Sequence, residues 1–368
     1  MTSTTTDAPT RSGFHPLRVT RVTRESPEAI AVTLQPPPQA EALFRFTPGQ
    51  YLTVRRVLDG EEQRRSYSIC AALDEGALRI GVKRVPGGRF SSWAVEHLKP
   101  GDVLEAMPPE GRFGLMPDPA AAPRTVLGIA CGSGITPVLS ILASLLAREP
   151  ESRAVLLYGN RSAADIMFRT ALEELKDRYL HRFSIVHVLS REKHELESLH
   201  GRLDAARIQA LLPGLVPPRA IAEAFLCGPE GLSDSATAAL TALGLPADHI
   251  HVERFTPAGG LPTARPPAPP APGTKPAATA TITLDGVTRE VPMAEGETIL
   301  EAGLRAGMDL PWSCRGGMCC TCRAKLTQGA VEMAQNYSLQ PWEMAAGFVL
   351  TCQSRPKGTQ LSVDYDAT

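Results

Sequence analysis

Five of the eight cysteines in this 368-residue chain lie between Cys314 and Cys352. Cys314, Cys319 and Cys322 have the spacing C-x4-C-x2-C, and Cys352 follows after twenty-nine intervening residues. This is the spacing of plant-type [2Fe-2S] sites. Three thiolates from one tight loop can wrap a small cluster, and a fourth from a distant strand can close it. We therefore predict that these four cysteines are iron ligands.

Structural zinc is the alternative for these cysteines. It normally uses two short knuckles of paired ligands rather than three ligands in one loop plus a distant fourth. Gly316 and Gly317 in the same loop leave room for backbone amides to approach sulfur. Cys320 is a surplus thiol beside a ligand, and we interpret it as a small buried hydrophobic side chain.

A second group of candidate residues ends an alternating segment in the first third of the chain. In RSYS, Arg65 offers a cation for a phosphate, Tyr67 an aromatic plane for a ring, and Ser68 a hydroxyl for a ring nitrogen. These are the contacts that a flavin requires. A half-buried barrel aromatic is the alternative for Tyr67.

Glycines and serines follow further along the chain. Gly87 and Gly88 predict a turn, and Ser91 and Ser92 open a predicted helix. The N-terminal amides of a helix can hold a pyrophosphate, which indicates FAD rather than FMN. An ordinary helix N-cap is the alternative for Ser91.

Two glycine-containing motifs follow apolar segments in the middle of the chain. GSGITP joins TVLGIA to a predicted helix, where the backbone passes close to a dinucleotide phosphate. CGP ends a later apolar segment, at the edge where open α/β sheets bind ligands. We assign to the nicotinamide nucleotide Gly132, Ser133, Gly134, Thr136, Cys227, Gly228 and Pro229. The first motif is not GxGxxG, which disfavours an ordinary dehydrogenase, and inert core packing is the alternative for Cys227.

Ser190 and Arg191 follow the apolar segment FSIVHVL. NAD-specific proteins of the Rossmann class often place an acidic residue here for the ribose hydroxyl. A hydroxyl and a guanidinium suit the extra phosphate of NADPH, so we predict NADPH as the electron donor. The alternative for Arg191 is a solvated loop cation, partly offset by Glu192.

These motifs lie on segments with different patterns of hydrophobic residues, which predict more than one domain. Short alternating segments such as 77–83 predict an FAD-binding β-barrel over 14–117. Apolar strands that alternate with helical stretches at 137–148 and 163–179 predict an α/β NAD(P)-binding domain over 118–255.

The last part of the chain follows a Pro/Ala-rich run over 256–280, which we interpret as an interdomain linker. Beyond it, 281–368 holds the cysteines. A hairpin around Asp285 and Gly286 and a helix at 298–306 are expected there. The plan is three unlike domains in series.

Composition and charge exclude several classes of function. Hydrophobic residues make up 43% and charged residues 21%, as in ordinary globular domains. The net charge of -1 provides no field to collect nucleic-acid phosphates. The N-terminus has no apolar h-region, and no apolar stretch is long enough to span a bilayer, so we expect a cytoplasmic protein that does not enter a membrane.

The sequence contains no motif typical of hydrolysis and no complete motif for oxygen activation. GxSxG and HExxH motifs are absent from the sequence. A di-iron bundle needs two Glu-x-x-His pairs, and the chain has one, Glu197 with His200. The chemistry is therefore expected to be electron transfer.

With RSYS, GGRFS, GSGITP, YGNR, CGP and the four cysteines in this order, the chain resembles ferredoxin-NADP reductase-like oxygenase reductases with a C-terminal plant-type ferredoxin domain. More narrowly, VKRVPGGRFSSWAVEHL, LLYGNRSAADIMFR and NYSLQPWEMAAGFVLTCQ look like the reductase subunits of phenylacetyl-CoA epoxidases. The resemblance implies a multidomain fold, with a β-barrel FAD-binding domain, an α/β nucleotide-binding domain and an α+β ferredoxin domain of the β-grasp type.

The resemblance also implies a role for each matching position. It places Arg65, Tyr67 and Ser68 at the flavin, Gly88 and Ser91 at its pyrophosphate, and Gly132, Thr136 and Cys227 along the nicotinamide nucleotide. Among these, Tyr67, Ser68 and Cys227 are the expected catalytic residues. It points to Cys314, Cys319, Cys322 and Cys352 as the iron ligands.

The expected function follows from the carriers. NADPH delivers a hydride, FAD accepts both electrons and releases them singly, and the cluster passes each one to an oxygenase. The expected partner is the oxygenase component, a multi-subunit di-iron monooxygenase, which a net charge of -3 over 281–368 would help to steer. The alternatives are a reductase for a Rieske-type oxygenase and a redox-sensing interaction module.

Overall fold

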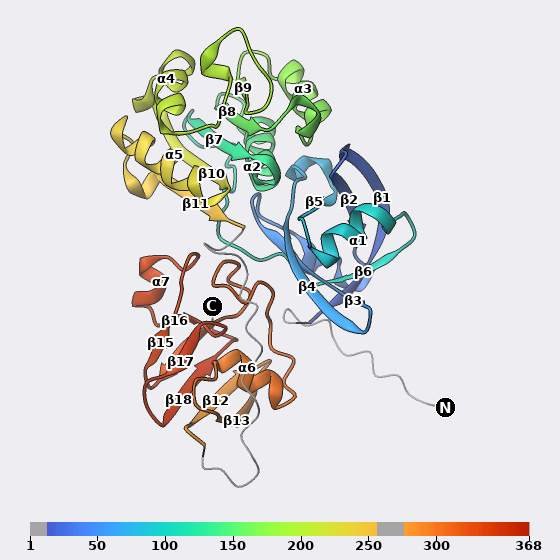
Figure 1. Ribbon diagram of the computed structural model, residues 1–368, viewed down its shortest axis with the longest axis vertical. Helices are drawn as coiled ribbons and strands as arrows, with labels where there is room; N and C mark the ends of the chain where they lie inside the picture. The colour runs from blue at the N-terminus through green and yellow to red at the C-terminus, as the bar shows by residue number, and fades with distance from the viewer. Residues whose placement is uncertain (1–12, 256–275, 368) are drawn as a thin grey trace. The chain divides into compact units, whose positions relative to one another are not determined.

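The structure, a computed structural model, describes residues 13–255 and 276–367, which belong to two compact units (Figure 1). The N-terminal unit is Phe14–Phe255, and the C-terminal unit follows the proline-rich run. Most of the predicted linker lies outside the described residues, and its last three residues already belong to strand β12. Within the described ranges, none of the helices has the length and apolar character needed to cross a bilayer.

The first domain is a six-stranded antiparallel sheet in the order β4-β3-β6-β1-β2-β5. Ile69, directly after β4, bridges Ile80 in β5, which brings the two edges of the sheet together as the predicted β-barrel requires. Phe90 and Ala94 of helix α1 pack into its apolar core. The elements are β1 His15–Ser26, β2 Ala29–Gln35, β3 Tyr51–Leu58, β4 Glu61–Ser68, β5 Leu78–Lys83, α1 Arg89–His97 and β6 Val103–Ala106.

The second domain is a parallel sheet in the order β11-β10-β7-β8-β9, as the alternating pattern predicts. Helices α2 and α3 cover one face of the sheet, and α4 and α5 cover the other (Figure 1). The carboxyl ends of all five strands therefore share one edge. The elements are β7 Thr125–Cys131, α2 Ile135–Arg148, β8 Arg153–Asn160, α3 Arg169–Arg178, β9 Phe183–Leu189, α4 Ala205–Leu215, β10 Ile221–Gly228, α5 Glu230–Ala242 and β11 Ile250–Arg254.

The helix expected over 163–179 is shorter than predicted. A 3-10 turn covers Ala163–Asp165, and α3 begins at Arg169. Phe168 between them has a φ of 58°, in the left-handed region. Its ring is buried against the barrel, and its amide donates to Glu25 Oε2 at 3.0 Å. This contact with another domain overrides the helical pattern in the sequence.

Helix α2 fastens the two N-terminal domains together. Ser140 Oγ donates to the carbonyl of Ala71 at 2.6 Å, and the amide of Leu73 donates to Ser144 Oγ at 3.0 Å. Gly81 in β5 leaves room for this contact, because a Cβ there would lie 2.5 Å from a side-chain carbon of α2. The barrel and the α/β domain are therefore held in one unit.

The C-terminal unit is built on a mixed sheet in the order β13-β12-β18-β14-β16. Its predicted hairpin is confirmed: Asp285 and Gly286 have φ values of 52° and 73°, as a tight turn between β12 and β13 requires. Thr298 caps the predicted helix, α6, and its Oγ1 accepts from the Glu301 amide. The elements are β12 Ala278–Leu284, β13 Val287–Met293, α6 Ile299–Arg305, β14 Arg323–Gln328, β15 Val331–Met333, α7 Pro341–Ala345, β16 Phe348–Leu350, β17 Ser354–Pro356 and β18 Gln360–Asp364.

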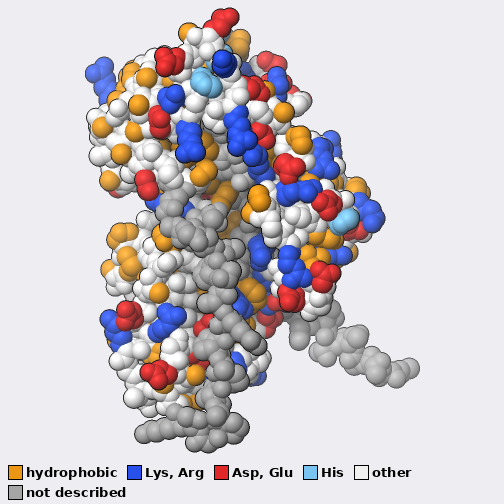
Figure 2. All heavy atoms as spheres, viewed as in Figure 1, with side chains coloured by type: hydrophobic (Ala, Val, Ile, Leu, Met, Phe, Trp, Pro, Cys, Tyr) orange, Lys and Arg blue, Asp and Glu red, His pale blue; other side chains and the backbone are white. Residues whose placement is uncertain are grey.

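Surface charge is mixed. On the face that Figure 2 shows, acidic and basic side chains are interspersed over the described parts of both units. This distribution agrees with the net charge of -1.

Candidate functional site

The cysteine loop of the C-terminal unit directs backbone amides at sulfur. The amides of Gly316 and Met318 donate to Cys314 Sγ at 3.3 and 3.4 Å. Gly317 has a φ of 77°, and a Cβ there would lie 3.0 Å from the Gln335 carbonyl oxygen. Amides that point at thiolates stabilise their negative charge, so the loop is shaped for anionic sulfur.

The four cysteines lie as two pairs. Cys319 is hydrogen-bonded to Cys314, and Cys322 to Cys352. Among the described residues, no three His, Cys, Asp or Glu side chains converge as one metal ion would require. Structural zinc needs four ligands around one ion, whereas a [2Fe-2S] cluster has two irons to share four thiolates. Four thiols that lie as two pairs fit a [2Fe-2S] cluster, whose two irons share four thiolates.

Cys352 reaches this loop from the end of β16. The amide and the hydroxyl of Thr351 both donate to the Cys322 carbonyl, at 3.1 and 2.9 Å. Gln353 Nε2 donates to Cys352 Sγ at 3.5 Å and to the Arg315 carbonyl at 2.8 Å. The fourth cysteine is thus tied to the loop by its two neighbours in the chain.

Cys320 lies next to the predicted ligand Cys319 in the chain, and it has a φ of 56°. Burial raises the pKa of its thiol to about 12. The Cys320 thiol is therefore neutral at neutral pH in this structure.

The residues predicted to hold the flavin meet on β4 and α1 of the N-terminal unit. The Tyr67 ring lies 5.6 Å from that of Phe90. Burial raises the pKa of Tyr67 although the nearby Arg65 charge lowers it, so the phenol stays neutral. The structure thus brings the aromatic plane and the cation of RSYS together.

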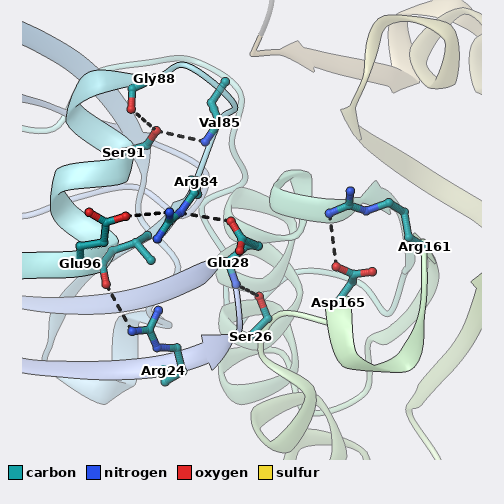
Figure 3. Close-up of polar contacts among 11 residues, drawn as sticks. Arg24, Ser26, Glu28, Arg84, Val85, Gly88, Ser91, Glu96, Arg161 and Asp165 are labelled. Carbon is teal, nitrogen blue, oxygen red and sulfur yellow. Dashed lines mark hydrogen bonds and ion pairs between the residues drawn. The ribbon is translucent and has the colours of Figure 1, made fainter.

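The turn before α1 has the predicted glycines. Gly87 has a φ of 73°, and a Cβ on Gly88 would lie 2.6 Å from Ser91 Oγ. Ser91 Oγ accepts from the Val85 amide at 3.1 Å and donates to the Gly88 carbonyl at 3.3 Å (Figure 3). The helix begins at Arg89, so the expectation that Ser91 opens it is wrong. Because the Ser91 hydroxyl is engaged in the turn, a phosphate here would meet the unpaired amides of the first helical turn.

Arg84 holds the base of this turn in place. Its guanidinium lies 3.1 Å from Glu28 and 2.7 Å from Glu96, one carboxylate on either side (Figure 3). The Arg84 guanidinium is therefore held by two carboxylates of the same domain.

The two glycine motifs of the α/β domain touch each other. A Cβ on Gly134 would lie 2.1 Å from the Cys227 carbonyl oxygen, so only glycine allows this approach. Gly132 has a φ of 55°, and its carbonyl accepts from the Tyr158 hydroxyl at 2.9 Å. Thr136 Oγ1 donates to the carbonyl of the loop residue Ser133 at 2.9 Å. The loop is fixed beside the carboxyl ends of β7 and β10, where Gly228 is the last residue of β10 and Pro229 precedes α5.

Ser68 and Cys227 share a neighbour that sequence reasoning missed, Glu253. It pairs in register with Cys227 on the adjacent strand, and its carboxyl is hydrogen-bonded to Ser68. Burial raises its pKa from 4.5 to about 8. Burial also raises the pKa of the Cys227 thiol, which stays neutral. Three strand ends from two domains therefore bring together a hydroxyl, a thiol and a protonatable carboxyl.

Glu253 also provides a test of fit for a ligand. Its Oε2 atom is buried and has no hydrogen-bond partner among the residues that the structure describes. A buried polar atom without a partner is costly unless a ligand or water completes it. The position next to Ser68 and Cys227 suits a flavin ring against a nicotinamide, and FAD bound there would convert a hydride into single electrons. The Ser68 hydroxyl and the Glu253 carboxyl can hold or release a proton beside it.

The residues predicted for the NADPH phosphate lie at the ends of β8 and β9. The Ser190 amide donates to the Asn160 carbonyl at 2.9 Å, and the Arg191 amide to the Arg161 carbonyl at 2.8 Å. The Ser190 side chain is half-buried, and that of Arg191 is exposed. This pairing places a second arginine, Arg161, beside the predicted one.

Asp165 lies among these cations. Its carboxylate accepts from Arg161 at 3.3 Å (Figure 3) and from Ser162 Oγ at 2.7 Å. Burial acts to raise the pKa of Asp165, but the Ser162 hydrogen bond and the charges of Arg161, Lys83 and Arg191 hold it below its ordinary value. Three cations therefore act on Asp165, and Glu192, whose Oε1 accepts from the Ala163 amide at 2.8 Å, lies at the same end of the sheet.

Comparison with known proteins assigns this architecture. Three family descriptions match: oxidoreductase FAD-binding domain over 16–114, oxidoreductase NAD-binding domain over 129–238, and 2Fe-2S iron-sulfur cluster binding domain over 282–357. A subunit of 1,2-phenylacetyl-CoA epoxidase from Escherichia coli (strain K12) is 45% identical, over 96% of this chain and 98% of that protein. The ferredoxin reductase component of 3-ketosteroid-9-alpha-monooxygenase from Mycolicibacterium smegmatis (strain ATCC 700084 / mc(2)155) is 35% identical, over 98% and 99%.

The chain belongs to the oxygenase reductase family. Members of this family are oxidoreductases with FAD-binding, NAD-binding and 2Fe-2S domains. Phthalate dioxygenase reductase has the same fold, with a TM-score of 0.57 and 24% identity over 96% of this chain and 98% of that one. The multidomain fold and the class of cofactors predicted from the sequence are confirmed.

Proposed function

We propose that this oxygenase reductase carries electrons from NADPH through FAD and a [2Fe-2S] cluster to a multi-subunit di-iron monooxygenase, the phenylacetyl-CoA epoxidase of aerobic phenylacetate degradation. The observation that carries the proposal is the 45% identity to a subunit of that epoxidase, which spans nearly the whole of both chains. The similarity includes the domain that must dock the oxygenase as well as the two that bind nucleotides.

The choice of NADPH rests on the ends of β8 and β9. Ser190 and Arg191 lie where an acidic residue would favour NADH. Arg161 and Lys83 add positive charge around Asp165. A 2′-phosphate brings negative charge that this group of cations attracts, whereas the ribose hydroxyl of NADH brings none.

The proposed roles follow the geometry. Tyr67 and Arg65 hold the flavin ring and phosphate, Ser68 and Cys227 contact the reacting rings, and the α1 N-terminus after Gly87 and Gly88 holds the pyrophosphate. The loop Gly132–Gly134, with Thr136, and the turn Cys227–Pro229 hold the nicotinamide nucleotide. We assign FAD binding to 14–117, nucleotide binding to 118–255, and the cluster to the C-terminal domain that begins with β12 at Ala278, after the linker, in a cytoplasmic protein.

Reconstitution tests the partner. The purified holoprotein is combined with a phenylacetyl-CoA epoxidase core, phenylacetyl-CoA and NADPH, and loss of the thioester is followed by chromatography. We expect loss that depends on all components and that stops when the Cys352→Ser chain replaces the wild type.

A Rieske-type oxygenase component serves as the alternative acceptor in a parallel reaction. Turnover with that oxygenase and none with the epoxidase core would refute the proposed partner. Electron delivery to neither oxygenase, with rapid reduction of the flavin and cluster by NADPH, would instead favour a redox-sensing module.

A further inference from the structure

A buried ion pair lies directly beside the cysteine loop. Arg323 follows Cys322 in the chain, and its amide donates to the Cys320 carbonyl at 2.9 Å. Its Nε lies 3.0 Å from Glu343 Oε1, and the two side chains are 18% and 1% exposed. A pair this deeply buried is little screened by solvent.

Both members of the pair are held in place by other contacts. The Arg323 guanidinium lies over the Phe348 ring, 3.6 Å from its centroid. Glu343 Oε2 accepts from the Gln340 amide at 2.9 Å, which closes the first turn of α7. The pair therefore fixes one charge of each sign at a set position.

The same contacts connect the two segments that supply the second pair of cysteines. Arg323 begins β14 directly after Cys322, and it pairs in register with Leu350 of β16. Phe348 begins β16, which leads to Cys352. The contacts of Arg323 thus connect β14, which follows Cys322, to β16, which precedes Cys352.

The two charges act on the cysteine loop with opposite sign. Arg323 directly follows the predicted ligand Cys322 and donates its amide to the Cys320 carbonyl, and Glu343 lies 3.0 Å from its guanidinium, so both charges lie beside the loop. Reduction of the cluster adds one negative charge, and the reduction potential of such clusters depends on nearby charge, hydrogen bonds and exposure. A fixed cation favours the reduced cluster, and a fixed carboxylate opposes it.

We propose that Arg323 and Glu343 are a positioning pair that sets the reduction potential of the [2Fe-2S] cluster by balancing one buried charge against the other. In the intact pair the two effects largely cancel. The potential of the cluster therefore stays low enough for electrons to leave toward an oxygenase. Removal of either partner exposes the cluster to the charge of the other.

Potentiometric titration of the full-length holoprotein, followed by the electron paramagnetic resonance signal of the reduced cluster, tests this proposal. Glu343→Gln leaves the cation unbalanced, and we expect the ratio of reduced to oxidised cluster at a given potential to rise roughly tenfold, or about 59 mV for one electron. Arg323→Gln leaves the carboxylate unbalanced, and the potential is expected to fall. The double variant is expected to return toward the wild-type value.

Glu297→Gln is the matched control. Glu297 is also a buried carboxylate in this unit, and it is paired with Arg305 at 2.8 Å. Like Glu343, it accepts a turn amide, that of Ala294, at 2.8 Å. Its loss removes a comparable ion pair on the α6 side of the domain, so stability is expected to fall while the potential shifts less than in Glu343→Gln.

Arg323→Lys separates charge from shape, because it keeps the cation and loses the planar contact with Phe348. We expect a near wild-type potential from it, and iron content per chain reports cluster loading in every variant. A purely structural pair would lower iron content without shifts of opposite sign. Shifts of the same sign in Glu343→Gln and Arg323→Gln, or none in Glu343→Gln, would overturn the proposal. If Glu343→Gln fails to load iron, the comparison of Arg323→Gln with Arg323→Lys decides it.

Discussion

The two units prepare for their redox groups in opposite ways. In the C-terminal unit, the amides of Gly316 and Met318 already point at Cys314 Sγ, and Gln353 ties Cys352 to the loop. In the N-terminal unit, Glu253 has a buried oxygen without a partner among the described residues. The cysteine loop is thus held by contacts within the protein. The site at Glu253 leaves a polar atom for a ligand to contact.

This difference matches the residence time of what each unit binds. A cluster that stays for the life of the protein benefits from a cage that is rigid before and after electron transfer. A nicotinamide must enter and leave in every cycle, so its site cannot be completed by the protein alone. The comparison implies that substitution of a cluster-binding cysteine abolishes electron transfer from the flavin to the cluster. Substitutions at the nicotinamide site are instead expected to change rates and affinities by finite factors.

The largest expected effect comes from the cage. Cys352→Ser removes one of the four predicted iron ligands, so we expect one-electron delivery to a protein acceptor such as cytochrome c to be abolished. Flavin reduction by NADPH, followed by loss of flavin absorbance in a stopped-flow instrument, is expected to continue.

Cys320→Ser is the matched control for this prediction, since it removes a thiol of the same loop that is no ligand. It is expected to keep both iron content and electron delivery. Delivery at the wild-type rate by Cys352→Ser would mean that the electrons do not pass through the cluster.

The next largest effect is expected at Glu253. Glu253→Gln keeps the shape of the side chain and the contact with Ser68 but removes the proton that the carboxyl can exchange. A positioned acid or base contributes roughly 10²–10⁴-fold to rate, so we expect steady-state turnover to fall by about that factor. The wild-type rate is expected to change with pH near 8, the pKa of this carboxyl, and the variant is expected to lack this dependence. An identical pH profile in the two proteins would remove Glu253 from the reaction.

A smaller effect is expected for the nucleotide. Arg191→Ala removes a cation that only the 2′-phosphate requires, and a hydrogen bond to a charged group contributes about 1.5–3 kcal/mol. We expect the Michaelis constant for NADPH to rise about 10- to 100-fold and that for NADH to stay nearly constant. Steady-state kinetics with both donors provide the measurement, and equal changes for both would place Arg191 outside the site.

The smallest effect concerns stability. Because the pKa of Glu253 is raised from 4.5 to about 8 in the folded chain, the folded state binds a proton that the unfolded state has lost over that interval. Its contribution to stability is therefore present below pH 4.5 and is lost as pH rises to about 8. The difference in unfolding temperature between wild type and Glu253→Gln is expected to change as pH rises from 4.5 to about 8 and to stay constant below and above that interval. A constant difference would show that this carboxyl does not titrate there.

The contrast between the units also explains what the sequence could predict. Cysteine is rare and chemically distinct, so the spacing of Cys314, Cys319 and Cys322 alone indicates the cluster site. Glu253 is one of many glutamates, and its partners Ser68 and Cys227 are distant in the chain. The one available signal was its position near the end of β11, next to β10 with its CGP motif, and this becomes visible only once the strand order is known.

The error at the start of α3 has a related cause. The pattern over 163–179 is helical, and no local residue signals a break. The left-handed Phe168 is fixed by Glu25, which lies in another domain and 143 residues away. Interactions between domains are not encoded in local periodicity, so this boundary could not be predicted.

Gly81 has a consequence for how the chain tolerates change. A methyl group there would lie 2.5 Å from Thr136 Cγ2 and 3.2 Å from the Phe168 ring. An alanine at this position therefore requires a shift of Thr136, in the first turn of α2, or of strand β5. The separation of the barrel from the nucleotide-binding loop thus depends on a residue that belongs to neither that loop nor α2.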